Sequence, residues 1–162
     1  VTSMLWGTAM ALLLISAVLL VILRSVPLGL ASLLPNLVPA AMAFGLWGYL
    51  DGEVNLAVSV VGAMTLGIVV DDTVHLLSRY LRARRELGLE PVEAARFSIM
   101  AVGKPVLVTS VALIIGFGAL TFSGFAVSAL MGFLAAITIL VALVADLVFL
   151  PPLLILLGRR VR

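Results

Sequence analysis

The sequence contains no cysteine, and charged residues make up only 11% of its 162 positions. The first absence excludes disulfides, a thiol nucleophile and a cysteine-ligated metal. The second excludes an ordinary soluble domain, because such a domain needs more charge than this to cover its surface. From residue 105 to residue 145 there is no charged residue at all.

Apolar residues make up 64% of the chain, and the mean hydropathy is +1.32. Several apolar runs reach the roughly 20 residues that a helix needs to cross about 30 Å of hydrocarbon. The runs lack the alternation of apolar and polar residues that a membrane β-barrel shows. The remaining structure that can cross the bilayer is the α-helix, which satisfies its own backbone hydrogen bonds. The sequence therefore predicts an all-α integral membrane protein.

The apolar runs predict five transmembrane helices, at residues 5–23, 28–50, 55–77, 105–120 and 126–150. A turn is expected at residues 121–125, where small and polar residues cluster. Residues 78–104 are polar, and we expect a short amphipathic helix at the interface beginning at Pro91. Pro151 and Pro152 are expected to end the last helix.

The five spans form a single transmembrane domain over residues 1–162, and the chain begins with Val1 rather than with an initiator methionine. We therefore expect a piece of a longer protein. Residues 1–23 lack the order of a basic region, a short apolar region and a cleavage site, so they are not interpreted as a signal peptide.

The basic residues predict how the chain is oriented. The net charge of +2 and a pI near 9.7 are compatible with a protein that binds nucleic acid. All ten Lys and Arg residues, however, lie at Arg24, in residues 78–104 or at the C-terminus, which five spans place on one side. The positive-inside rule then puts the N-terminus outside and the C-terminus in the cytoplasm, and the nucleic-acid interpretation is dropped.

The third span carries two adjacent acids. Counting back from Arg79 places Asp71 about 12 Å inside the cytoplasmic boundary. A carboxylate at that depth costs about 2.5–3.5 kcal/mol, so it should face the bundle interior and is a functional candidate. His75 and Gly67 share the face of Asp71, and Gly67 would let another helix approach closely. Asp72 points about 100° away, and two adjacent carboxylates in a low dielectric do not both ionise easily, which favours proton binding.

Each candidate also has a structural interpretation. Asp71 and Asp72 would then be polar contacts between helices, although Ser, Thr or Asn provide these at lower cost. The side chain of His75 would extend toward the lipid headgroups at the membrane interface. Asp146, a further acid within the membrane, would pair with another helix or cap the break at the prolines, and we prefer this structural role. Thr109 and Ser110 are possible hydrogen-bond partners of the acids, on a weak signal.

The sequence contains no recognisable enzyme motif. The two aspartates are not followed by the third aspartate of a DDxxD site, and Asp146 lacks the Gly-x-Gly-Asp context of intramembrane proteases. A metal site at Asp71, Asp72 and His75 would need more oxygen ligands than the sequence offers. The sequence therefore predicts no enzyme, no cofactor and no metal.

A set of ordered motifs resembles the RND superfamily, in its MMPL or predicted-exporter branch. The motifs include Leu34-Pro35-Asn36, Gly103-Lys104-Pro105, Thr109-Ser110, Ala145-Asp146-Leu147 and the stretch Gly67-Ile68-Val69-Val70-Asp71-Asp72-Thr73-Val74-His75. The likeness covers essentially the whole chain. It implies five helices of one six-helix repeat, placed after a large extracytoplasmic domain and most consistent with the second repeat.

The resemblance also implies a function. Members of this family use the proton gradient to move lipids or other hydrophobic molecules outward across the bacterial inner (plasma) membrane. Asp71 and Asp72 would form the proton relay, with support from His75, Thr109, Ser110 or Asp146. The missing partners are the other repeat, the extracytoplasmic domains and possible further subunits. The alternative is a sterol-sensing-like module that binds lipid or acts as a scaffold without pumping.

Overall fold

The computed structural model describes residues 56–158 continuously, with side chains from residue 60, and a few residues between 6 and 49. The expected spans at residues 5–23 and 28–50 fall largely outside this description. In the continuous part every element is a helix, and the order is α3 (Leu56–Arg85), α4 (Pro91–Leu120), α5 (Ala126–Val144), the π-helix η1 (Ala145–Phe149) and α6 (Leu150–Gly158). The all-α class is confirmed.

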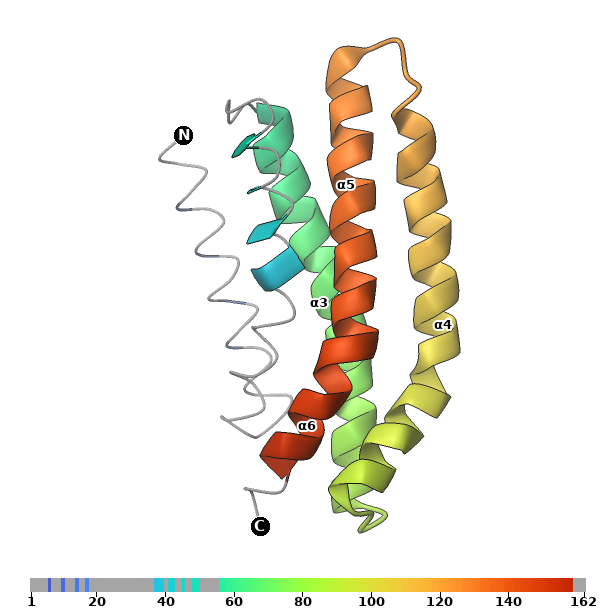
Figure 1. The fold of residues 1–162 in the computed structure, drawn as a ribbon. Helices are drawn as coiled ribbons and strands as arrows, with labels where there is room; N and C mark the ends of the chain where they lie inside the picture. The colour runs from blue at the N-terminus through green and yellow to red at the C-terminus, as the bar shows by residue number, and fades with distance from the viewer. Residues whose placement is uncertain are drawn as a thin grey trace.

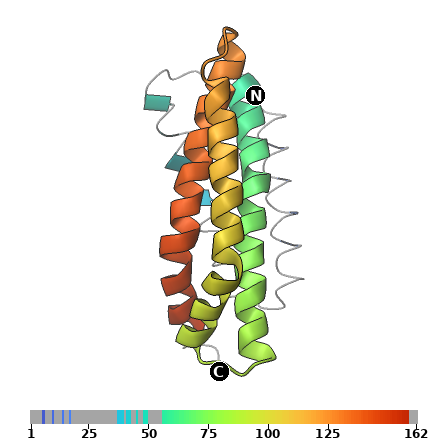
Figure 2. The ribbon, with the colours of Figure 1, turned by 90° about the vertical axis from the view of Figure 1, so that its right-hand side faces the viewer.

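Three of these described helical stretches are long and apolar enough to cross a membrane: Val60–Arg85, Pro91–Leu120 and Ala126–Gly158. They run side by side in Figure 1, where the chain continues beyond η1 as α6, which is angled toward the lower left. Figure 2 shows α4 running in front of α3 and α5, and each of the three long helices contacts the other two. The residues that link α4 to α5 are 121–125, where the turn is expected.

A tight turn joins α3 to α4. Gly88 has a φ of +64°, in the left-handed region that glycine adopts without a steric penalty. The amide of Leu89 then donates to the carbonyl oxygen of Ala83 at 3.1 Å, and the Arg84 guanidinium donates to the Leu89 carbonyl oxygen at 2.7 Å. Pro91 follows at the start of α4, where its missing N–H costs nothing.

The first half of α4 corrects one prediction. The sequence suggests a separate interfacial helix followed by a span that starts at Pro105, but α4 is one helix from Pro91 to Leu120. A proline inside a helix costs about 3 kcal/mol or more. That cost is offset because Ala94, Ala95 and Ser98 are buried in the bundle and hold the segment helical. The result in Figure 1 is a bend in the lower part of α4 rather than a break.

The second correction concerns Pro151 and Pro152, which do not end the last helix. The chain passes through them as α6 and reaches Gly158. The π-helical turn η1 lies immediately before them, and the amide of Leu150 donates to the carbonyl oxygen of Ala145, five residues back. A wider turn of this kind gives room to the proline rings, which would otherwise clash with carbonyl groups four residues earlier.

Two apolar clusters hold the described helices together. One contains Val61 of α3 with Leu134 and Ala135 of α5. The other cluster contains residues from each of the helices α3, α4 and α6. Its members include Leu76, Leu77, Tyr80, Ala94, Ala95, Leu150 and Leu154. At the first cluster α4 and α5 approach closely, since a Cβ at Gly132 would collide with the Phe117 carbonyl oxygen and Leu120. Between Val61 and Tyr80, at residues 71–73 of α3, the contacts become polar.

Candidate functional site

Three consecutive polar residues lie near the middle of the span Val60–Arg85. They are Asp71, Asp72 and Thr73, and successive residues of a helix point about 100° apart. Helix α3 therefore presents a polar group in three directions at one level of the membrane. The structure gives each group a different neighbour.

Asp71 points to the open side of α3. Its Oδ1 atom lies 3.6 Å from Nε2 of His75, one turn further along the helix. Both side chains are largely exposed, at 72% for Asp71 and 63% for His75. Gly67 lies one turn before Asp71, and within the described part of the chain nothing comes within 4 Å of a Cβ built on it. We call Ala63, Gly67, Asp71 and His75 the open face of α3; all four are exposed.

Asp72 is turned toward α4. Its Oδ2 atom accepts a hydrogen bond from the Ser110 hydroxyl at 3.2 Å, and the Ser110 side chain is buried. This hydrogen bond connects α3 with α4, and the two residues are 38 positions apart in the sequence. A hydroxyl is a suitable partner here, because it can donate to a carboxylate or accept from a protonated carboxyl.

Thr73 is turned toward η1, where it meets the most deeply buried acid that the structure describes. Asp146 is only 1% exposed, and its Oδ1 atom lies 2.9 Å from the Thr73 hydroxyl oxygen. The π-helical turn places Asp146 on this inward side. Asp72 directly precedes Thr73 on α3, so Asp72 and Asp146 lie at the same level of the bundle, one on α3 and the other on η1.

The other buried hydroxyls show that these contacts are not general. The hydroxyls of Thr65, Ser98 and Thr138 donate to carbonyl oxygens of their own helices at 2.7–2.8 Å. Hydroxyl groups in membrane helices are commonly satisfied in this way. Thr73 and Ser110 are the described hydroxyls that reach a carboxyl group on another helix.

The candidates from the sequence thus separate into two groups. Asp72 and Ser110 are brought together, and so are Asp71 and His75, whereas Thr109 is exposed and donates to the Pro105 and Val106 carbonyl oxygens of its own helix. Gly67 lies beside Asp71, but no described helix packs on it. Among the described residues, no three His, Asp or Glu side chains gather as a metal site would require.

The structure decides between the two structural roles considered for Asp146. Asp146 does not cap a helix break, because no break exists at the prolines; it pairs with α3, which is the other role considered. Thr73 is not predicted as a site residue, although its place directly after two intramembrane acids is the available signal. Spacing alone could not identify its partner, which lies 73 residues later in the chain.

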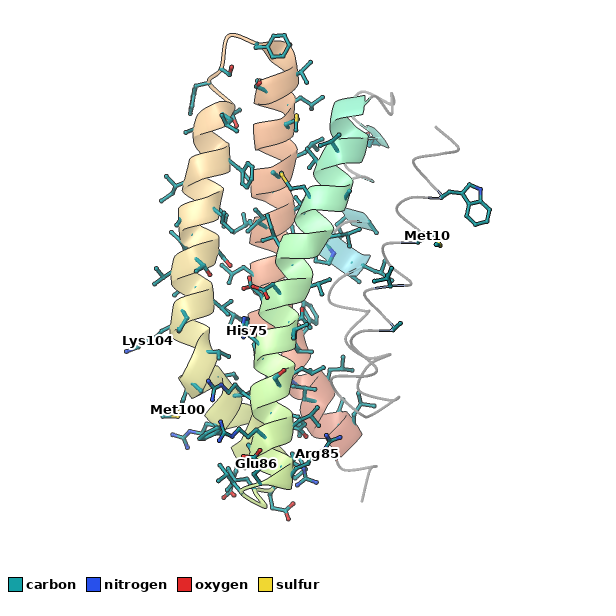
Figure 3. All side chains as sticks on the ribbon, turned by 180° about the vertical axis from the view of Figure 1, so that it is seen from behind. Met10, His75, Arg85, Glu86, Met100 and Lys104 are labelled. Carbon is teal, nitrogen blue, oxygen red and sulfur yellow. The ribbon has the colours of Figure 1, made fainter. Side chains whose placement is uncertain are left out.

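Figure 3 shows the surroundings of the open face. His75 lies at the edge of α3 that is next to α4 in this view, while Lys104 and Met100 point outward from α4. Arg85 and Glu86 mark the end of α3 that is rich in charge. Throughout residues 56–158, every Lys and Arg falls between residues 79 and 104. The acids at mid-span are thus set apart from the basic end of the bundle.

Comparison with known proteins agrees with this architecture. The family model described as "MMPL family" matches residues 2–162. The protein MJ1562 of Methanocaldococcus jannaschii, whose given name describes it as a membrane protein, is 28% identical over 154 residues. That match covers 95% of this chain but only 39% of the relative. The chain therefore spans well under half the length of this relative.

Proposed function

Since the chain belongs to the MMPL family, we propose that it is the transmembrane part of a proton-motive-force-driven exporter of lipids or other hydrophobic molecules. Asp71 and Asp72 bind and release the protons. The chain acts as a transporter and not as an enzyme. It lies in the bacterial inner membrane with its C-terminus in the cytoplasm, on the side of the basic residues 79–104.

The open face of α3 is the observation that carries this proposal. Asp71 and His75 are largely exposed at the middle of an apolar helix. An acid facing hydrocarbon there costs about 2.5–3.5 kcal/mol, so such groups normally face protein or a water-filled path. Gly67, one turn away, leaves room for a close helix contact. A second transmembrane repeat, in the same chain or in another subunit, is the natural cover for this face.

The neighbouring acid gives the relay a second position. Asp72 contacts Ser110 on α4 and is shielded from the open face, whereas Asp71 lies on it. Adjacent carboxyl groups in a low dielectric disfavour the state in which both are charged. A proton on one of them is therefore linked to the charge of the other. A carboxyl pair with one shielded and one open member is suited to taking a proton from one side and releasing it elsewhere.

Replacing Asp71 with Asn in the full-length protein tests this proposal. Asn keeps the shape of the side chain but cannot exchange a proton, so proton-coupled flux should fall by roughly 100-fold. The measurement uses vesicles of the host's own lipids, a trapped pH-sensitive dye and an imposed pH gradient. Such vesicles also supply the lipid class of substrate.

The matched control is Glu93→Gln, which removes the same charge from an exposed acid near the start of α4. This variant should transport normally, and both variants should insert into the membrane in wild-type amounts. Normal flux through the Asp71→Asn protein would remove Asp71 from the relay.

A further inference from the structure

The Thr73 hydroxyl lies between two oxygen atoms that both accept hydrogen bonds. One is the carbonyl oxygen of Val69 at 3.2 Å, and the other is Oδ1 of Asp146 at 2.9 Å. A threonine hydroxyl has a single proton to donate and two lone pairs with which to accept. It reaches both oxygen atoms as a donor only by sharing that proton, as the Thr109 hydroxyl does between the Pro105 and Val106 carbonyl oxygens.

The Thr73 hydroxyl need not share its proton if Asp146 carries a proton of its own. The carboxyl group then donates to the Thr73 oxygen, and the Thr73 hydroxyl donates to the Val69 carbonyl oxygen. Both short distances become full hydrogen bonds in one chain across α3 and η1. If Asp146 is ionised, the Thr73 hydroxyl has to share its single proton between the two oxygen atoms, and a charged group remains 1% exposed in the bundle, which is costly without a cationic partner.

The described surroundings of Asp146 offer no such cation. The Lys and Arg residues of the continuous part lie at positions 79–104, toward the end of α3 and in the first half of α4. Asp146 contacts Thr73, the residue next to Asp72, so a second acid lies close to it. Repulsion therefore disfavours the state in which both acids are ionised. The acids are linked although they lie on different helices.

We propose that Asp146 is a third proton-carrying carboxyl group of the relay, which holds its proton in the arrangement seen and donates it to Thr73. That Asp146 takes part in transport rests on the proposed function. That Asp146 is protonated does not. Loss of the proton from Asp146 is then favoured when Asp72 takes one up. The π-helical turn η1 serves this chemistry because it sets Asp146 against α3.

Infrared spectroscopy of the full-length protein in lipid tests the protonation directly. A protonated carboxyl group has a C=O stretching band that a carboxylate lacks. We expect one component of this absorption to disappear in Asp146→Asn and to remain in Asp71→Asn. In Thr73→Val, which keeps the shape of Thr73 without the hydroxyl, the band should remain but shift, because the hydrogen bond is gone. A spectrum unchanged by Asp146→Asn would overturn the proposal.

Proton flux in vesicles of host lipids tests the role in the relay. Asp146→Asn should lose roughly 100-fold of the coupled flux, while Thr73→Ser, which keeps the hydroxyl, should retain most of it. If Asp146→Asn does not fold, the shift in Thr73→Val decides, and an unshifted band would overturn the Thr73 contact. Normal flux in Asp146→Asn together with lost flux in Asp71→Asn would refute this inference alone. Normal flux in both variants would refute the proposed function.

Discussion

Asp72→Asn is expected to abolish proton-coupled export, with a loss of roughly 100-fold or more in flux. Asp72 is the member of the acid pair that contacts the rest of the bundle, through Ser110 on α4. Asn preserves this contact, because its side-chain oxygen can still accept from the hydroxyl. The loss would therefore report the missing proton exchange and not a disrupted interface between helices.

Ser110→Ala is the matched comparison for Asp72→Asn. It removes the hydrogen bond but leaves the acid in place, and a hydrogen bond to a charged group contributes about 1.5–3 kcal/mol. We expect Ser110→Ala to retain measurable flux with an altered pH dependence, since Asp72 still exchanges protons. An equal loss of flux in both variants would show that transport depends on the hydrogen bond between Asp72 and Ser110 and not on proton exchange by Asp72.

Tyr80→Ala is expected to have the largest effect on stability. Tyr80 is among the largest fully buried side chains described, and its hydroxyl donates to the Leu154 carbonyl oxygen at 3.0 Å. Truncating a buried aromatic residue costs about 3–5 kcal/mol. Tyr80 lies where α3 meets the start of α4 and the end of α6. A Cβ at Gly158 of α6 would collide with the Tyr80 hydroxyl and contact Pro91 of α4. The thermal unfolding midpoint in detergent should fall markedly.

Tyr80→Phe separates packing from hydrogen bonding at the same position. It keeps the ring and loses one neutral hydrogen bond, which contributes about 0.5–1.5 kcal/mol. The thermal midpoint should therefore fall much less than in Tyr80→Ala. If the two variants unfold at the same temperature, the hydroxyl and not the packing of the ring holds α6 against α3.

The sequence predicts those features of this fold that depend on local chemistry. Apolar runs without charge indicate membrane helices, and the small and polar residues at 121–125 mark the connection that the structure places between α4 and α5. Asp71 and His75 are four residues apart, so helix geometry alone puts them on one face. Pro91 is recognisable as a helix start because a missing N–H is tolerated there.

The features that the sequence does not predict depend on contacts between helices. Pro105 and Pro151 look like helix boundaries, yet both lie inside helical stretches that tertiary packing and a π-helical turn maintain. The sequence leaves open whether Asp146 caps a broken helix or pairs with another helix, and its contact with Thr73 exists only once α3 and η1 are side by side. Local propensity describes the cost of a proline but not the packing that offsets it.

The most direct test of proton-driven export uses the unmodified full-length protein. Lipids on the outer side of the membrane are measured by mass spectrometry in cells with and without the protein, before and after a protonophore collapses the proton gradient. We expect the protein-dependent lipids to stop appearing when the gradient is lost and to reappear when it is restored. Export that continues unchanged without the gradient would contradict the relay and favour a lipid-binding module that does not pump.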